Sequence, residues 1–283
     1  MQVEGKRLTR DVKNCQGSKL ARSENVNSIT DNSSNLSFIY TNADCFTNKR
    51  PELIAFLNAL SYKPSIIIIT EVNSKSSYNK MQESEFVLDG YNMYSSNIGA
   101  VSSRGVIIYV NSALHSSQFE TDTKFEECVF VQIKMRDARN LLVGGFYRSP
   151  NSSLENNLHL EKLITEINND SSLNKILVGD FNCPNINWTD WTIESNSTNS
   201  WSCSFLSCLR ENLLMQHVSV PTRLRGGDTP HTLDLIITDN DFIDDIIYLS
   251  PLGKSDHCIL QFNCSLCCQQ VFDNSKFNYN KVR

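Results

Sequence analysis

The sequence has no long hydrophobic run. Its longest apolar stretches, such as Ile66–Ile69, have the length of a strand, whereas a membrane-spanning helix needs roughly 18 consecutive apolar residues. The N-terminal stretch MQVEGKRLTRDVKNCQG is polar and has no apolar core, so it is not a secretory signal. We therefore expect a protein that is not secreted, has no membrane partner, and works in the nucleus or the cytoplasm.

The sequence also lacks an excess of positive charge and a regular cysteine pattern. Its net charge is −5, which argues against a protein that coats nucleic acid through a broad basic face. A nuclease is not excluded, because acidic metal ligands make the metal-free sequence look more negative. The 10 cysteines show no repeated pairing and are interpreted as free thiols in a reducing compartment. Cys264, Cys267 and Cys268 have no second ligand pair nearby, which disfavours zinc.

Short β-branched or aromatic runs recur from Leu36 onward, each bounded by Asn, Ser, Gly, Pro or Asp, and they predict strands. They are Leu36–Tyr40, Ser65–Thr70, Gly105–Val110, Cys128–Met135, Leu141–Tyr147, Lys175–Val178, Leu233–Thr238, Ile246–Leu249 and Cys258–Phe262. Apolar residues at helical spacing predict helices over 51–60, 154–168 and about 202–214, with Leu158 and Leu213 among the residues of the apolar faces. This mixture predicts an α/β fold, a four-layer α/β sandwich in which two mixed β-sheets pack face to face with helices outside. A TIM barrel would need stricter strand–helix alternation.

Composition divides the chain into three parts. Residues 1–35 are rich in Asn, Ser and charge without an apolar period, which predicts a disordered polar leader. Residues 36–263 form the expected domain. Residues 264–283 lose the strand pattern and are expected to be a tail or the start of a linker to a further domain.

Polar side chains follow the first two predicted strands. Asn42 and Asp44 lie two residues apart after Leu36–Tyr40, and Glu71 ends the buried run Ser65–Thr70. Taken alone, the first pair is better explained as a turn. Glu71 is either a solvated residue or a ligand of a hard cation such as Mg²⁺.

Three further strand ends carry candidate chemistry. Tyr147 and Arg148 follow a glycine-containing strand, and the guanidinium of an arginine matches phosphate oxygens. Gly179-Asp180-Phe181-Asn182 gives the strongest local signal, because its carboxylate can take a proton from water while its amide donates to phosphate. Asp234 lies inside an apolar run, where a carboxylate needs a partner, and pairing with His257 would fix the imidazole tautomer.

In this order, these pieces resemble the endonuclease/exonuclease/phosphatase superfamily over about residues 36–262. The segments Tyr40–Ala43, Phe146–Pro150, Pro221–Arg223 and Thr232–Asp239 are similar to the apurinic-type endonuclease of non-LTR retrotransposons. The stretch Phe277–Lys281 resembles the linker to a reverse transcriptase in such elements, so we expect a fragment of a longer element.

The resemblance implies a role for each matching residue and a magnesium ion, or manganese in its place. The implied metal ligands are Glu71, Asp44, Asn42 and Asp256; the implied catalytic residues are Asp180, His257, Asp234, Tyr147 and Asn182; the implied substrate-binding residues are Asn182, Arg148, Ser255 and Arg223. The implied partners are double-stranded DNA and a reverse transcriptase domain, and the implied product is a nick with a 3′-hydroxyl for target-primed reverse transcription. Arg104 departs from the glycine pair of many relatives, and we expect it to alter a loop without touching a catalytic residue.

Two alternatives remain open. The same fold serves phosphatases and lipid phosphodiesterases, although the segment Pro221–Arg223 and the Tyr147–Arg148 pair favour nucleic acid. A catalytically inactive remnant of an element could also act as a binding module, although the complete acidic set argues against it.

Overall fold

The computed structural model describes residues 35–74, 82–100, 102–136, 139–193 and 200–267. All of them fall within one compact unit, Ser33–Arg283. The predicted leader, apart from residue 35, and the predicted tail after residue 267 lie outside the described residues. Within the described ranges, no helix combines the length and apolar character needed to span a membrane.

The first sheet has six strands in the order β13-β14-β1-β2-β4-β3. Only the β1–β2 pair is parallel, and the other neighbours are antiparallel, so the sheet is mixed. The bounds are β1 Asn35–Asn42, β2 Ile66–Thr70, β3 Tyr91–Ser96, β4 Val106–Asn111, β13 Ile247–Leu249 and β14 Ile259–Cys267.

The second sheet also has six strands, in the order β11-β12-β8-β7-β6-β5. It contains one parallel pair, β7–β8, among antiparallel neighbours. The bounds are β5 Ser116–Gln118, β6 Cys128–Ile133, β7 Asn140–Tyr147, β8 Leu173–Asp180, β11 Met215–Gln216 and β12 Asp234–Thr238, with a separate hairpin of β9 Ile186–Asn187 and β10 Thr192–Ile193.

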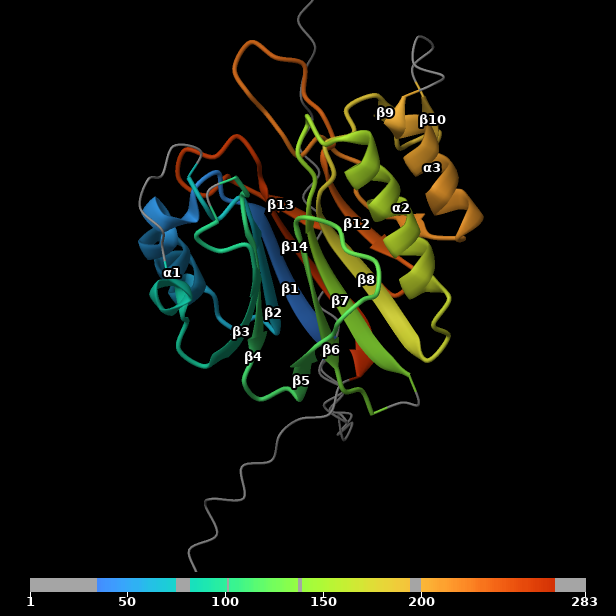
Figure 1. Cartoon of the computed structure of the whole chain (residues 1–283). Coiled ribbons are helices and arrows are strands. Elements are labelled where there is room, and N and C mark those ends of the chain that lie inside the picture. Colours follow the sequence, from blue (N-terminus) through green and yellow to red (C-terminus); the bar gives the residue numbers. More distant parts are fainter. Residues whose placement is uncertain (1–34, 75–81, 101, 137–138, 194–199, 268–283) are drawn as a thin grey trace, which may run out of the picture. The chain divides into compact units, whose positions relative to one another are not determined.

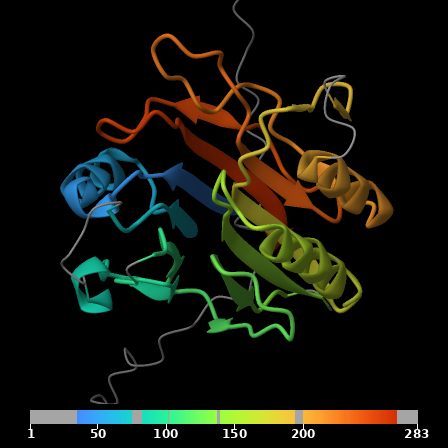
Figure 2. The same cartoon turned by 45° about the horizontal axis from the view of Figure 1, so that its top comes forward.

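The alternation of side chains along buried strands builds the layers. In β2, Ile66 and Ile68 point into the core between the sheets, whereas Ile67 and Ile69 pack on the opposite face in the cluster that includes Leu53 of α1. The helices lie outside the two sheets (Figure 1; Figure 2). These are α1 Arg50–Ala59 beside the first sheet and α2 Leu154–Asn168 and α3 Trp201–Glu211 against the second, with two short 3-10 turns, η1 Phe46–Asn48 and η2 Glu83–Phe86. The predicted α/β sandwich of two mixed sheets is confirmed.

Some local predictions were wrong. Leu158 of α2 and Leu213 are 54% and 83% exposed rather than packed on the apolar faces. Helix α3 ends at Glu211, and the positive φ of 53° at Leu213 turns the chain away from the helix. Strand β3 was not predicted, because its side chains are half-buried at a sheet edge and lack a strong apolar pattern.

Strand direction brings the polar strand ends to one edge of the sandwich. Antiparallel pairing places Val106, which begins β4, opposite Thr70 at the end of β2. It likewise places Asp234, which begins β12, opposite Asp180 at the end of β8. Residues that follow β1, β2, β7 and β8 therefore lie at the same edge as residues that precede β4, β6, β12 and β14.

Candidate active site

A cleft of about 970 Å³ opens at this edge. Its walls combine carboxylates, one imidazole, one phenol and basic side chains. The predicted site residues on these walls are Asp44, Glu71, Tyr147, Asp180, Asn182, Arg223, Asp256 and His257. Asn42 and Asp234, both fully buried, contact these residues from behind.

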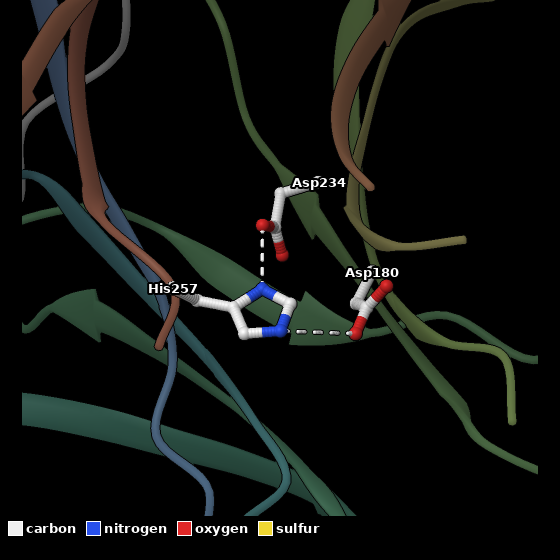
Figure 3. Close-up of side chains that lie close together, drawn as sticks. All are labelled: Asp180, Asp234 and His257. Carbon is white, nitrogen blue, oxygen red and sulfur yellow. Dashed lines mark hydrogen bonds and ion pairs between the residues drawn. The ribbon is translucent and has the colours of Figure 1, made fainter. Parts of the chain in front are cut away.

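A buried histidine–aspartate pair forms one side of the cleft (Figure 3). His257 Nδ1 lies 2.7 Å from Asp234 Oδ2, and the Tyr40 hydroxyl donates to Asp234 Oδ1 at 2.6 Å. Burial lowers the pKa of His257, but the charges of Asp234, Asp180 and Asp256, together with the hydrogen bond to Asp234, outweigh it and raise that pKa to about 10. The imidazole is therefore cationic at neutral pH, and its Nε2 edge is the one turned toward Asp180.

Asp180, at the end of β8, contacts Asn42 of β1 and lies close to this histidine. Its Oδ2 is 4.0 Å from His257 Nε2 and accepts from Asn42 Nδ2 at 2.9 Å. Its Oδ1 accepts from the Asn182 backbone N–H at 3.1 Å. Burial and then the negative charge of Asp234 raise the pKa of Asp180 well above its usual range, so this carboxylate has an increased affinity for a proton. The close approach of the strands explains Gly179, because a Cβ there would overlap the Phe146 carbonyl oxygen.

A second acidic group follows β1 and β2. Asn42 Nδ2 also donates to Glu71 Oε1 at 3.1 Å, which ties Glu71 to Asp180. Asp44 and Glu71 have positive φ angles of 38° and 53°, a backbone strain typical of functional sites. The Arg104 guanidinium forms an ion pair with Glu71 and another with Asp44 at 2.7 Å. Arg104, which was expected to alter a loop without touching a catalytic residue, thus contacts two of the expected metal ligands.

The donors in this acidic group fit a hard divalent cation. Carboxylate oxygens from Asp44 and Glu71, on strained backbone at the cleft wall, are ligands that suit Mg²⁺ or Mn²⁺. The amide oxygen of Asn42 accepts from the Asp44 backbone N–H at 3.1 Å, and its Nδ2 donates to the Glu71 and Asp180 carboxylates. Asn42 therefore positions the Glu71 carboxylate and the backbone of Asp44.

Another acidic group could also hold a metal ion, since ligand atoms of Asp180, Asp234 and His257 lie within 4.8 Å of one another. Both Asp234 oxygens already accept hydrogen bonds, from Tyr40 and His257. This leaves that group better suited to hydrogen bonding than to coordination.

The two remaining predicted residues, Arg148 and Ser255, use their polar groups in contacts within the protein. Arg148 is buried, lies 3.7 Å from the Trp201 ring centroid, and donates to Asn157 at 2.7 Å. Ser255 is buried and donates to the Asn42 backbone oxygen at 2.7 Å.

On the cleft wall, Asp256 accepts from Arg223 Nε at 2.9 Å. Its other oxygen, Oδ1, lies 3.7 Å from His257 Nε2. Asp256 therefore stands beside the imidazole, between it and the basic side chain of Arg223.

Two residues near β6 complete the wall. Glu127, which the sequence analysis missed, is buried and accepts from the backbone N–H groups of Arg104 and Gly105 at 2.8 and 2.9 Å. Burial raises its pKa to about 7. Burial and then the charge of Glu71 raise the pKa of Tyr147, so its phenol stays protonated as a donor.

Comparisons with known proteins bear on this arrangement. A family model described as endonuclease-reverse transcriptase matches residues 141–261. The endonuclease domain of TRAS1, a telomere-specific non-LTR retrotransposon, superposes with a TM-score of 0.57 at 17% identity, over 81% of this chain and 98% of that one. The AP endonuclease LMAP from Leishmania major superposes with a TM-score of 0.61 at 14% identity, over 85% of this chain and 90% of that one. An AP endonuclease from Archaeoglobus fulgidus superposes with a TM-score of 0.56 at 15% identity, over 84% of this chain and 99% of that one.

The resemblance to the endonuclease/exonuclease/phosphatase superfamily is confirmed. The family-model match also supports the retrotransposon endonuclease type and the expected enzyme class, a metal-dependent hydrolase. No curated protein is a significant match to the chain. The matched residues 141–261 contain Asp180, Asp234 and His257, whereas Asp44, Glu71 and Arg104 precede them.

Proposed function

We propose that this protein is a Mg²⁺-dependent endonuclease that nicks double-stranded DNA, with Mn²⁺ able to replace Mg²⁺. One observation carries the proposal: Asp180 lies 4.0 Å from cationic His257 and is linked through the Asn42 amide to Glu71. A proton acceptor, a cation and a pair of carboxylates thus surround one cleft, as phosphodiester hydrolysis requires.

The Glu71 and Asp44 carboxylates would hold the divalent ion, with Asn42 fixing the Glu71 carboxylate and the Asp44 backbone. The bound ion would neutralise phosphate charge and favour the attack of water, a contribution of several kcal/mol to the transition state. Asp256 lies farther along the wall, where Arg223 already neutralises part of its charge, and it would act beside the imidazole.

Asp180 would orient the attacking water and take its proton, which its raised pKa favours. Asn182 lines the cleft and would hold the scissile phosphate. Its backbone has a positive φ of 50°, and its amide is fixed by donation to the Arg148 carbonyl at 2.8 Å. Arg148 and Ser255 would support the site from behind rather than contact substrate.

His257, oriented and charged by Asp234, would stabilise negative charge on the phosphate as the attacking oxygen bonds to phosphorus. Tyr147, kept protonated, would donate a hydrogen bond to the phosphate or to the leaving oxygen. As the bond between phosphorus and the leaving oxygen breaks, that oxygen would take a proton from solvent and become the 3′-hydroxyl of the nick.

DNA fits the cleft better than a small phosphate ester or a lipid head group. Arg223, Arg225 and Lys254 line the cleft with the acidic residues, and basic side chains positioned beside a site hold the phosphates of a continuous backbone. The titles of the similar structures name a retrotransposon endonuclease and AP endonucleases. On this basis we assign the nick to target-primed reverse transcription, with a reverse transcriptase domain as partner and the nucleus as the site of action.

The test compares substrates. Purified protein in Mg²⁺ is incubated with supercoiled plasmid, with inositol phosphates and with sphingomyelin. We expect plasmid relaxation, no nicking by Asp180→Ala, and wild-type nicking by Asp241→Asn, a control at an exposed aspartate outside the cleft. Hydrolysis of a lipid or inositol phosphate without plasmid nicking would contradict the proposal, as would full nicking by Asp180→Ala.

A further inference from the structure

Arg104 occupies the space between the two carboxylates that would hold the metal. Its Nη2 contacts Glu71 and lies 2.7 Å from Asp44 Oδ1. The Glu71 and Arg104 side chains are only 10% and 11% exposed, whereas Asp44 is 44% exposed. The guanidinium therefore reaches the inner end of the acidic group rather than pairing at its rim.

The protein holds Arg104 in this place through its backbone. Glu127 accepts from Arg104 N at 2.8 Å and from Gly105 N at 2.9 Å. Gly105 has a φ of +75°, a conformation that favours glycine. The loop that carries Arg104 is thus fixed at the start of β4, next to the end of β2.

The guanidinium is incompletely satisfied there. Nε and Nη1 of Arg104 are buried and have no hydrogen-bond partner among the described residues. Of the side chain's donors, only Nη2 meets an acceptor, and burial opposes the charge that Glu71 stabilises. A buried arginine with most of its donors unused is held by the two carboxylates alone.

We propose that Arg104 is a built-in cation that competes with the divalent ion for Glu71 and Asp44 and sets the metal affinity of the site. This inference rests on the proposed function, because it takes these carboxylates as the metal ligands. A guanidinium and a divalent ion both need the inward-facing carboxylate oxygens, and their positive charges repel. Metal binding therefore has to break the contact between Arg104 and Glu71.

Calorimetric titration with MgCl₂ and with MnCl₂ tests the inference. We expect Arg104→Gln to lower the Kd for each ion by about tenfold or more, because one opposing charge is removed. The matched control, Arg225→Gln, removes the same charge from the same cleft and should change the Kd by less than about threefold. An unchanged or higher Kd in Arg104→Gln, while wild type binds, would overturn the inference. Absence of Mg²⁺ binding and plasmid nicking in wild type and both variants would instead overturn the proposed function.

A second measurement follows Arg104 in the wild-type protein itself. The side-chain ¹⁵Nε signal of Arg104 in the wild-type protein, assigned with Arg104→Lys, is followed during titration with Mg²⁺. We expect it to shift with the same midpoint as the calorimetric titration, since the contact with Glu71 breaks as the ion binds. A signal that stays in place at saturating Mg²⁺ would show that the two cations do not compete.

Discussion

The cleft contains two groups of charged residues that are organised in different ways. In the histidine group, Asp180, Asp234 and His257, both oxygens of Asp234 accept hydrogen bonds and the protein itself fixes the imidazole. In the carboxylate group, Asp44, Glu71 and Arg104, the carboxylates pair with an arginine of which two buried nitrogens have no hydrogen-bond partner in the part of the chain that the structure describes.

Asp234 thus has both of its oxygens satisfied by the protein, whereas Asp44 and Glu71 share a cationic partner. The family model covers the histidine group at residues 141–261 and does not reach the carboxylate group. The hydrogen bonds to Asp234 orient the imidazole in the matched part, whereas the carboxylates outside the match pair with Arg104.

Removal of the inner metal ligand should give the largest effect. We expect Glu71→Gln to lower the nicking rate by about 10³-fold or more and to abolish Mg²⁺ binding by calorimetry, because a neutral amide replaces a carboxylate at the inner end. Glu83→Gln, at an exposed glutamate of η2, is the control. Normal Mg²⁺ binding by Glu71→Gln would show that the carboxylate group does not hold the metal.

The histidine group should fail in a different way. Asp234→Asn removes the charge that keeps His257 cationic, and we expect nicking to fall by about 10²-fold. Its Kd for Mg²⁺ should stay within about twofold of wild type, because Asp234 is committed to Tyr40 and His257. Loss of Mg²⁺ binding in this variant would show that the histidine group also holds the metal, so that the two groups form a single metal site.

Glu127, which holds the backbone of Arg104, should make the free energy of unfolding depend on pH. Burial raises its pKa from 4.5 to about 7, so between these values the folded protein keeps a proton that the unfolded chain releases. The free energy of unfolding therefore falls as pH rises from 4.5 to 7 and stays lowered above pH 7.

Residue 127 does not titrate in the variant Glu127→Gln. The free energy of unfolding of this variant minus that of wild type should therefore rise by on the order of 2 kcal/mol between pH 4.5 and pH 7. Urea unfolding at several pH values measures this difference. The adjacent exposed Glu126→Gln is the control and should follow wild type. Parallel pH profiles for wild type and Glu127→Gln would show that the Glu127 carboxyl is not perturbed.

The smallest expected effect concerns Arg148. Because its guanidinium packs over Trp201 and donates to Asn157, we expect Arg148→Lys to lower the free energy of unfolding by about 1 kcal/mol. Nicking should change by less than about threefold. A large rise in KM for plasmid with unchanged stability would instead support the direct substrate contact that the sequence suggested.

The sequence was most informative where a polar residue follows a buried strand. Glu71 follows β2, the Gly179–Asn182 segment spans the end of β8, and the parallel strands within each sheet end at the same edge. Asp234, which begins β12, and His257, which precedes β14, were singled out as a candidate pair, and the resemblance supplied their catalytic roles. Glu71 and Asn182 also require positive φ angles, a strain that no pattern of residue types reveals.

Arg104 and Glu127 were not found because they precede β4 and β6. A residue before a strand reaches this edge only if that strand runs antiparallel to one that ends there, and strand pairing is not encoded locally. Strand β3 was missed for a related reason, because a half-buried edge strand has no continuous apolar run. Knowledge of the strand directions would thus have added Arg104 and Glu127 to the candidate site.

The central claim is that the two groups act together through a divalent ion in one cleft. The most direct measurement is the fraction of supercoiled plasmid nicked by wild-type protein in Mg²⁺, after addition of EDTA, and after Mg²⁺ is restored. We expect nicking, its loss in EDTA, and its full return with Mg²⁺. Nicking that continues unchanged in excess EDTA would rule out a divalent ion in the reaction.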